Sequence, residues 1–253
     1  MSQSACAARV ERGDPDRYRA TLAAPAALRG DLFTLYAFNL EIARAPWLTK
    51  EAMIAEMRLQ WWRDVVSAPA PRAHEVAAPL HALIQRARLP LGVIDAMIVA
   101  RHWDIRAEPF DDAAAFARYI NDTAGNLMWL AALICGAGPK AETPVRAYGY
   151  AAGLAAYLCA VRELEARGRR PLVDGRSDAV RALAIGGLQA LSTARAARRD
   201  VGAGRPALLC GWQAEGLLRH ACATPTLVAA GHLGLSEFSR RGRLVWQSFS
   251  GRW

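Results

Sequence analysis

Apolar residues recur along this chain at the three- and four-residue spacing of helices, and the alternating pattern typical of strands is almost absent. The clearest segment runs from residue 30 to residue 45 and stops at Pro46. Its apolar side chains cover nearly the whole circumference of the predicted helix, and such a helix is surrounded by other helices. This segment is therefore predicted to lie inside a helical bundle.

The next helix is predicted to begin at Thr49, whose hydroxyl suits an N-cap, with Glu51 in the favourable first turn. Met53, Met57 and Trp61 then follow at intervals of four residues, which predicts one buried stripe. Core packing is the interpretation that we prefer for this stripe. The functional alternative is an apolar tunnel for a prenyl chain or a quinone tail.

Further helix signals continue to the end of the chain. Pro79 and Pro90 each suit the first turn of a helix, and a longer helical segment is predicted over residues 111–134. Thr143–Pro144 predicts the start of a further helix, and Ser177–Asp178 predicts the start of one that reaches about Arg199. We find no internal repeat and no flexible linker, and the polar loop 167–178 is too short to separate two domains. The sequence predicts a single all-α domain, residues 1–253, of roughly eight helices.

The composition is that of a globular protein, with 53% hydrophobic and 22% charged residues, and the formal net charge is +9. Lys50 and Lys140 are the only lysines among the 32 basic residues. Because arginine binds phosphates and carboxylates in a bidentate manner, anionic partners are favoured. A general compositional bias is the alternative for most of the arginines. No nucleic-acid-binding motif accompanies the charge, so nucleic acid is not expected as a partner.

The five cysteines are scattered and form no CxxC pair, which predicts neither a zinc site nor a disulfide framework. The N-terminal segment has no long apolar stretch typical of a secretory signal. The stretch "AGNLMWLAALICGAG" comes closest to a membrane span but is too short. We expect a cytoplasmic protein, with peripheral contact to the inner face of the membrane as an option.

Three segments resemble the squalene/phytoene synthase family. "RYRATLAAPAALRGDLFTLYAFNLEI" is similar to its N-terminal part, and "AAGLAAYLCAVRELEARGRRPLV" stands where the family has its second aspartate-rich motif. "RHWDIRAEPFDDAAAFARYINDTAGNLMWLAALICG" is similar to the middle region, in which Asp104 and Tyr119 match a family aspartate and tyrosine. The resemblance implies an isoprenoid synthase-like helical bundle, which agrees with the helical pattern.

Enzymes of this family join two prenyl diphosphates, and their magnesium ions are held by two aspartate clusters on facing helices. The positions of the first cluster read Ala43, Arg44 and Trp47 here. The second region keeps only Glu163 and Glu165, which point in different directions on a helix. We therefore expect no metal, no cofactor and no catalytic residue. Magnesium would be needed only if the chain were a divergent prenyl transferase.

The stretch "AFNLEIARAPWLTKEAMIAEMRLQWWRDVV" resembles a branch of the family that lacks these aspartates. That branch includes a mitochondrial assembly factor for respiratory complex I, the NADH:ubiquinone oxidoreductase. The resemblance implies a non-catalytic protein that assists complex assembly, with respiratory-complex subunits or the membrane surface as partners. One alternative is a carrier for an isoprenoid or lipid phosphate. The other is a divergent prenyl diphosphate transferase with relocated carboxylates, namely Glu41, Asp104, Asp122 and Glu163.

The family geometry suggests that Arg44 and Arg162 face one central cavity, where their guanidinium groups could hold a diphosphate or lipid phosphate without metal. The alternative places one arginine at the surface and the other in an ion pair. Glu41 is either a remnant of a metal site or, as we prefer, the ion-pair partner of an arginine, because an unpaired buried carboxylate is costly. The remaining candidates for ligand binding are Tyr36, Met57, Trp61, Tyr119 and Asp122.

The last segment, "SRRGRLVWQSFSGRW", interleaves arginines with aromatic residues. This combination suits a membrane headgroup layer or an acidic protein partner. The candidate contacts are Arg240, Arg241, Arg243, Trp246 and Phe249. The alternative is a terminal helix that docks its aromatic side chains on the bundle and leaves its arginines in water.

Overall fold

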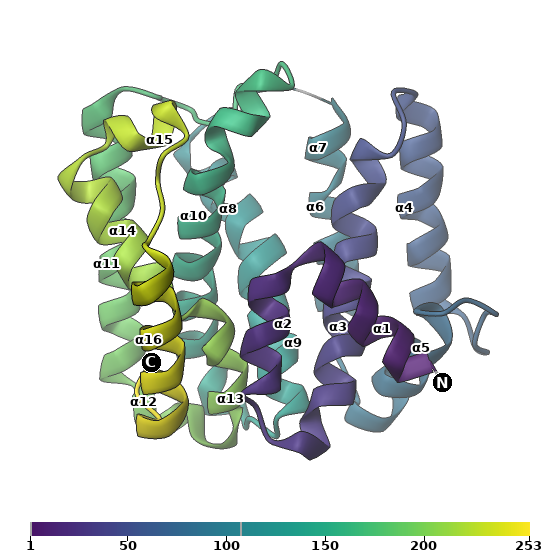
Figure 1. Ribbon diagram of the computed structural model, residues 1–253. Coiled ribbons are helices and arrows are strands. Elements are labelled where there is room, and N and C mark those ends of the chain that lie inside the picture. Colours follow the sequence, from purple (N-terminus) through teal and green to yellow (C-terminus); the bar gives the residue numbers. More distant parts are fainter. Residues whose placement is uncertain (1, 107) are drawn as a thin grey trace.

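The computed structural model describes residues 2–106 and 108–253, with the side chains of all of these except 2, 3 and 241 (Figure 1). Within these ranges the chain is built from helices, turns and loops, without a strand, as the hydrophobic pattern predicted. None of the described helices has the length and apolarity that crossing a bilayer requires.

The first helices are α1 (Ser2–Gly13), α2 (Pro15–Leu22), α3 (Ala26–Arg44), α4 (Ala52–Ser67), α5 (Ala77–Ala87), α6 (Leu91–Ala100) and α7 (His102–Arg106). They are followed by α8 (Ala113–Ile120), α9 (Asn126–Ile134), α10 (Glu142–Ala166), α11 (Ser177–Ala196), α12 (Arg198–Val201), α13 (Arg205–Leu208), α14 (Ala214–Ala223), α15 (Thr226–Ala230) and α16 (Glu237–Ser250). Short 3₁₀ turns, η1 (Ala45–Trp47), η3 (Pro139–Ala141), η4 (Gly202–Gly204) and η5 (Leu209–Gly211), link some of them. The expected number of roughly eight was too low, because the second half of the chain contains several very short helices.

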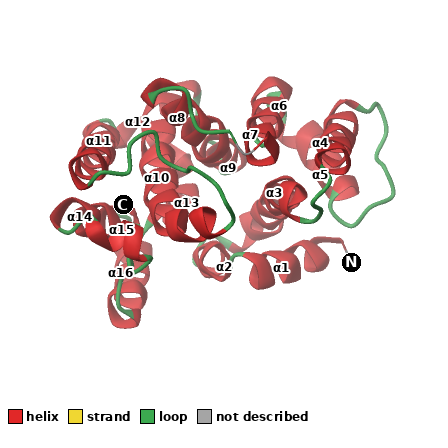
Figure 2. Ribbon diagram, turned by 90° about the horizontal axis from the view of Figure 1, so that it is seen from above, coloured by secondary structure: helices red, strands yellow, loops and turns green. Residues whose placement is uncertain are grey.

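Two long helices, α3 and α10, form the interior of the bundle (Figure 2). Helix α3 contacts α1, α5 and α9, while α10 contacts α9, α11 and α14. Leu35, Ala37, Phe38 and Ile42 of α3 are fully buried, on different sides of the helix. The prediction that this segment is surrounded by other helices is thus confirmed.

The face that α4 buries differs from the predicted one. Met57 is 65% exposed, and Met53 is similarly exposed, so the stripe of methionines points to solvent. The buried row contains Leu59 and Trp62 instead, and the Trp62 indole meets the Phe38 ring edge-on at 5.4 Å. Both rows are apolar in sequence, and the large indole is the side chain that fills the space beside α3. Trp61 is half-buried at the edge of this contact.

A wide turn divides the predicted 111–134 helix. Asp112 caps α8 by accepting a hydrogen bond from the Ala115 N–H at 2.7 Å. The chain then forms a π-helical turn, η2 (Asn121–Gly125), before α9 continues in the same direction. This turn packs against Gly153 of α10, where an added Cβ would lie only 2.2 Å from the Cβ of Ala124. The glycine therefore allows the close approach of these two segments.

Candidate ligand-binding cavity

A cavity of about 330 Å³ lies between α2, α3, α10 and the α8–η2–α9 segment, with η5 and α14 on its remaining side. Small residues of α10 form one wall, namely Gly149, Ala152, Gly153, Ala155 and Ala156. Gly149 and Gly153 allow η2 to pack closely against α10, and the short alanine side chains leave space beside this contact. Most of the remaining wall is apolar and includes Ile120, Leu127, Met128 and Leu217.

One polar region of the cavity is built on the start of α2. Asp14 caps this helix by accepting from the Arg17 N–H at 2.9 Å, and it also pairs with the Arg17 guanidinium at 2.9 Å. The guanidinium lies over the Tyr36 ring, 5.2 Å from its centroid. The Cys210 thiol donates to the Tyr36 hydroxyl at 3.3 Å. Burial raises the pKa of Tyr36 well above its ordinary value, so the phenol stays neutral at physiological pH.

A second polar region contains Arg101, Asp104 and Tyr119. The Tyr119 hydroxyl donates to the buried Asp104 carboxylate at 3.0 Å, and Arg101 Nη1 donates to the same carboxylate at 3.3 Å. Burial raises the pKa of Asp104, and the Arg101 charge opposes that shift. Arg101 and Tyr119 line the cavity, whereas Asp104 lies behind them and holds them in place.

Three cavity residues carry buried polar atoms without a hydrogen-bond partner in the protein. They are Nε of Arg17, Nε of Arg101 and Oδ1 of Asn39. An unsatisfied buried group of this kind costs about 1–3 kcal/mol. A ligand that offers acceptors to both guanidinium groups and a donor to the amide would remove this cost. The cavity can thus bind an anionic group on an apolar body.

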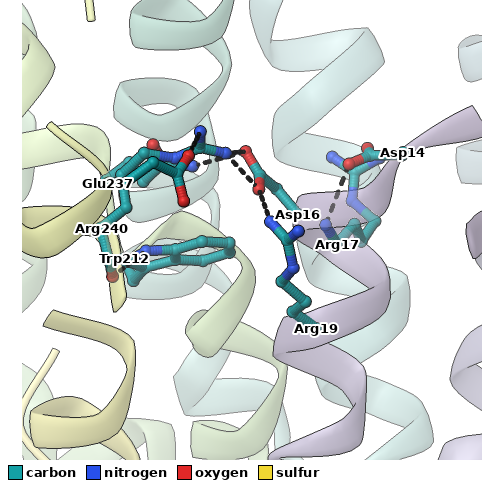
Figure 3. A network of polar contacts seen from close by, with 8 residues as sticks. Asp14, Asp16, Arg17, Arg19, Trp212, Glu237 and Arg240 are labelled. Carbon is teal, nitrogen blue, oxygen red and sulfur yellow. Dashed lines mark hydrogen bonds and ion pairs between the residues drawn. The ribbon is translucent and has the colours of Figure 1, made fainter. Parts of the chain in front are cut away.

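Asp16 lies at the side of the cavity that faces α16 (Figure 3). Arg240 of α16 donates to Asp16 at 2.6 Å and to Glu237 at 2.6 Å. Arg19 and Gln213 also donate to the Asp16 carboxylate, at 3.2 and 2.8 Å. This network ties α16 to the start of α2 and occupies the carboxylate with cationic and amide donors.

Residues 10–173 match the family model described as squalene/phytoene synthase. The chain belongs to the squalene/phytoene synthase family. Within the curated relatives it is 26% identical over 134 residues to "NADH dehydrogenase (ubiquinone) complex I, assembly factor 6" of Bos taurus, and 25% identical over 134 residues to the same factor of Homo sapiens. These matches cover 52% of this chain but only 40% of each relative.

Solved structures of squalene and dehydrosqualene synthases share the fold of this family member. A dehydrosqualene synthase superimposes with a TM-score of 0.76 at 11% identity, covering 100% of this chain and 97% of that one. The squalene synthase of Alicyclobacillus acidocaldarius gives a TM-score of 0.69 at 17% identity, covering 92% and 95%. The prediction of an isoprenoid synthase-like all-α bundle is confirmed.

The cavity of this family member does not fit a magnesium cluster of the kind the family's chemistry implies. Such a cluster needs several converging carboxylates. Asp14 and Asp16 are the carboxylates in the cavity wall, and each is bound by arginine. In the described part of the chain no group of three or more His, Cys, Asp or Glu side chains could hold a metal ion. At the first motif the indole of Trp47 lies against two guanidinium groups, at 4.9 and 5.0 Å.

Tyr36 and Tyr119, two of the predicted ligand-binding residues, line the cavity. Arg44 and Arg162 do not, and the structure does not bring them together. Both are exposed, Arg44 beside α1 and Arg162 beside Gly231 after α15, and these helices lie on opposite sides of the bundle (Figures 1 and 2). The expectation that these two arginines face one cavity was therefore wrong.

The remaining predicted residues also lie outside the cavity wall. Met57 and Trp61 belong to the outer side of α4 described above. Glu41 pairs with Arg9 of α1, as the ion-pair hypothesis expected. Asp122, in η2, is half-buried beside Asn121. The relocated carboxylates do not converge either, since Glu163 pairs with Arg167 at the surface and Asp104 is bound by Arg101 and Tyr119.

Sequence reasoning missed Arg17, Arg101 and Cys210. A local signal existed for Arg17, because "DPDR" is a helix start with a capping aspartate and a proline in the first turn. Arg101 could have been found from its position three residues before Asp104, a spacing that places two helical side chains side by side. No local signal pointed to Cys210, which reaches the cavity from beyond the matched segment.

Proposed function

We propose that this chain is a non-catalytic member of its family that acts by binding and assists the assembly of respiratory complex I. The similarity to assembly factor 6 supports the role in assembly. One observation supports the lack of catalysis: the carboxylates in the cavity wall, Asp14 and Asp16, are both held by arginine.

The chemistry explains why that observation matters. Release of pyrophosphate from an allylic diphosphate builds negative charge on the leaving group, and metal ions held by free carboxylates neutralise it. In this cavity Asp14 is engaged by the cap of α2 and by Arg17, while Asp16 is engaged by Arg240 and Arg19. A carboxylate that moved to a metal would leave an arginine unpaired. Binding without turnover is the function that this arrangement favours.

Deletion of the gene in the source organism tests the assembly role. Membranes of the deletion strain should lose most of their NADH:quinone activity and assembled complex I, while succinate:quinone activity stays unchanged as the control. Unchanged NADH:quinone activity would refute the proposal. Purified protein should release no pyrophosphate from farnesyl or geranylgeranyl diphosphate with magnesium, and magnesium-dependent release would establish the prenyl transferase instead.

The unsatisfied polar atoms favour a second function, that of a carrier for an isoprenoid or lipid phosphate. Arg17 and Arg101 would bind the phosphate, and the apolar wall would bind the chain. Farnesyl phosphate should bind in the presence of EDTA, and farnesol much more weakly. Arg17→Gln should weaken phosphate binding by about 10- to 100-fold, which corresponds to the free energy of one hydrogen bond to a charged group. Arg58→Gln, at an exposed arginine of α4, is the matched control. Equal affinities for the two variants would exclude the carrier.

A further inference from the structure

Helix α16 presents an apolar face to the outside of the bundle. Phe238 is 90% exposed and Phe249 is 88% exposed, and Val245 lies between them on the same face because the intervals are seven and four residues. Trp246 extends this face on one side and is also exposed. A surface helix normally turns its apolar stripe towards the core. Here the polar face, through Arg240, is the one attached to the bundle.

A groove of about 830 Å³ runs beside this face, between α16 and the segment from α11 to α14. Its arginines are Arg195, Arg198, Arg199, Arg205, Arg243 and Arg252. Glu215 is the carboxylate in its wall, and that side chain is already bound by Arg195 and Arg219. Among the described residues, none of the other five arginines of the groove has a carboxylate at ion-pair distance. The groove therefore carries concentrated positive charge.

We propose that α16 and this groove form one docking surface for an anionic phospholipid membrane. The boundary of a bilayer presents phosphates and an apolar layer side by side, which is the combination that the groove and the outer face of α16 match. Guanidinium groups bind phosphate in a bidentate manner. Trp246 lines the groove and belongs to the exposed face, and indoles favour the headgroup level.

Contacts at both ends hold this surface in place before docking. Near the first turn, Arg240 pairs with Asp16, and its carbonyl accepts from the Trp212 indole N–H at 3.1 Å. Just after the helix, the Trp253 carbonyl accepts from Arg195 Nε at 2.8 Å, and the Trp253 ring meets Tyr148 edge-on at 5.2 Å. A surface that is already ordered loses little conformational entropy on binding.

Sedimentation of the full chain with lipid vesicles tests the proposal. Binding to vesicles of mixed phosphatidylglycerol and phosphatidylcholine should be strong at low salt, and binding to phosphatidylcholine alone should be weak. The double variant Arg198→Gln/Arg205→Gln should bind roughly 25-fold more weakly, since each surface arginine contributes about fivefold. Arg58→Gln/Arg72→Gln removes the same charge from two exposed arginines far from α16 and should bind like the wild type.

The apolar face is tested with a matched pair of variants. Phe238→Ser/Phe249→Ser should weaken vesicle binding by at least about tenfold, because the rings no longer enter the apolar layer. Met53→Ser/Met57→Ser changes two apolar residues of α4 that are also exposed, at 68% and 65%, and should have little effect. Urea denaturation of each variant establishes that it is folded.

Four outcomes would overturn the proposal. The first is that the wild type does not prefer anionic vesicles, and the second is that the control variants lose as much binding as the groove and ring variants. The third is that inorganic phosphate at millimolar concentration binds as tightly as the vesicles, which would identify a site for a small anion. The fourth is self-association in sedimentation velocity that the phenylalanine variants abolish, which would make a second copy the occupant.

Discussion

Replacing Glu215 by glutamine should destabilise the protein at neutral pH and do so less in acid. Glu215 accepts from Arg195 at 2.8 Å and from Arg219 at 2.7 Å, and these bonds lower its pKa from 4.5 to about 2. Since one pKa unit corresponds to about 1.4 kcal/mol, the shift sets an upper limit of about 3.4 kcal/mol. The side chain is 25% exposed, so solvent screening reduces the expected cost to about 1–2 kcal/mol.

The pH dependence follows from the direction of this shift. Because the folded pKa lies below the unfolded one, the stabilisation is complete above pH 4.5 and is lost as the pH falls towards 2. At a pH of about 3.5, roughly two fifths of the difference between wild type and Glu215→Gln should have disappeared. Urea denaturation at this pH and at about pH 7 measures both values.

Glu142→Gln is the control for this experiment, because Glu142 is 46% exposed and pairs with Arg146 within one helix. Such a pair contributes only about 0.3–0.5 kcal/mol. A cost for Glu215→Gln that equals the control, or that is the same at both pH values, would refute the reasoning.

Three further predictions concern packing, and urea denaturation measures each of them. Trp62→Ala should cost about 3–5 kcal/mol and Met57→Ala under about 0.5 kcal/mol, because only the indole is buried; similar costs would contradict the orientation of α4. Tyr119→Phe removes a donor from a buried carboxylate and should cost about 1.5–3 kcal/mol, so an unchanged stability would argue against this network. A methyl group added at Gly186 meets no other atom, so Gly186→Ala should stabilise the fold by about 0.5–1 kcal/mol. Gly153→Ala should destabilise it by about 1–3 kcal/mol, because the added methyl group would clash with η2. Changes of the same sign in the two variants would contradict this contact.

Much of the fold could be predicted from the sequence, because helical periodicity is a local property. The apolar circumference of residues 30–45 correctly predicted a helix inside the bundle. The orientation of α4 could not be predicted in the same way, since Met57 and Trp62 belong to two neighbouring apolar rows. The choice between them depends on the contact of Trp62 with Phe38 of α3, and the periodicity of α4 alone carries no information on such a contact between helices.

The cavity was less accessible to sequence reasoning. Tyr36 and Tyr119 were found through the resemblance to the family, which supplied information on tertiary position. Arg17 and Arg101 were missed because arginine is so frequent in this chain that no single one stands out. The contact between Tyr36 and Cys210 joins residues that are 174 positions apart, and no local pattern reports such a distance.

The wide turn η2 sets the rotational phase between α8 and α9. Consecutive residues of a regular α-helix differ by about 100°, so Tyr119 and Leu127, eight positions apart, would be out of phase by about 80°. A π turn contains one extra residue, which reduces the mismatch to about 20° and lets both side chains reach the cavity. Loss of one residue from Asn121–Gly125 would turn η2 into regular α-helix and keep Leu127 and Met128 in phase with Tyr119, whereas one further residue would rotate them by about 100°, out of the cavity wall. The cavity wall beside η2 therefore depends on how many residues lie between Tyr119 and Leu127 more than on which residues they are.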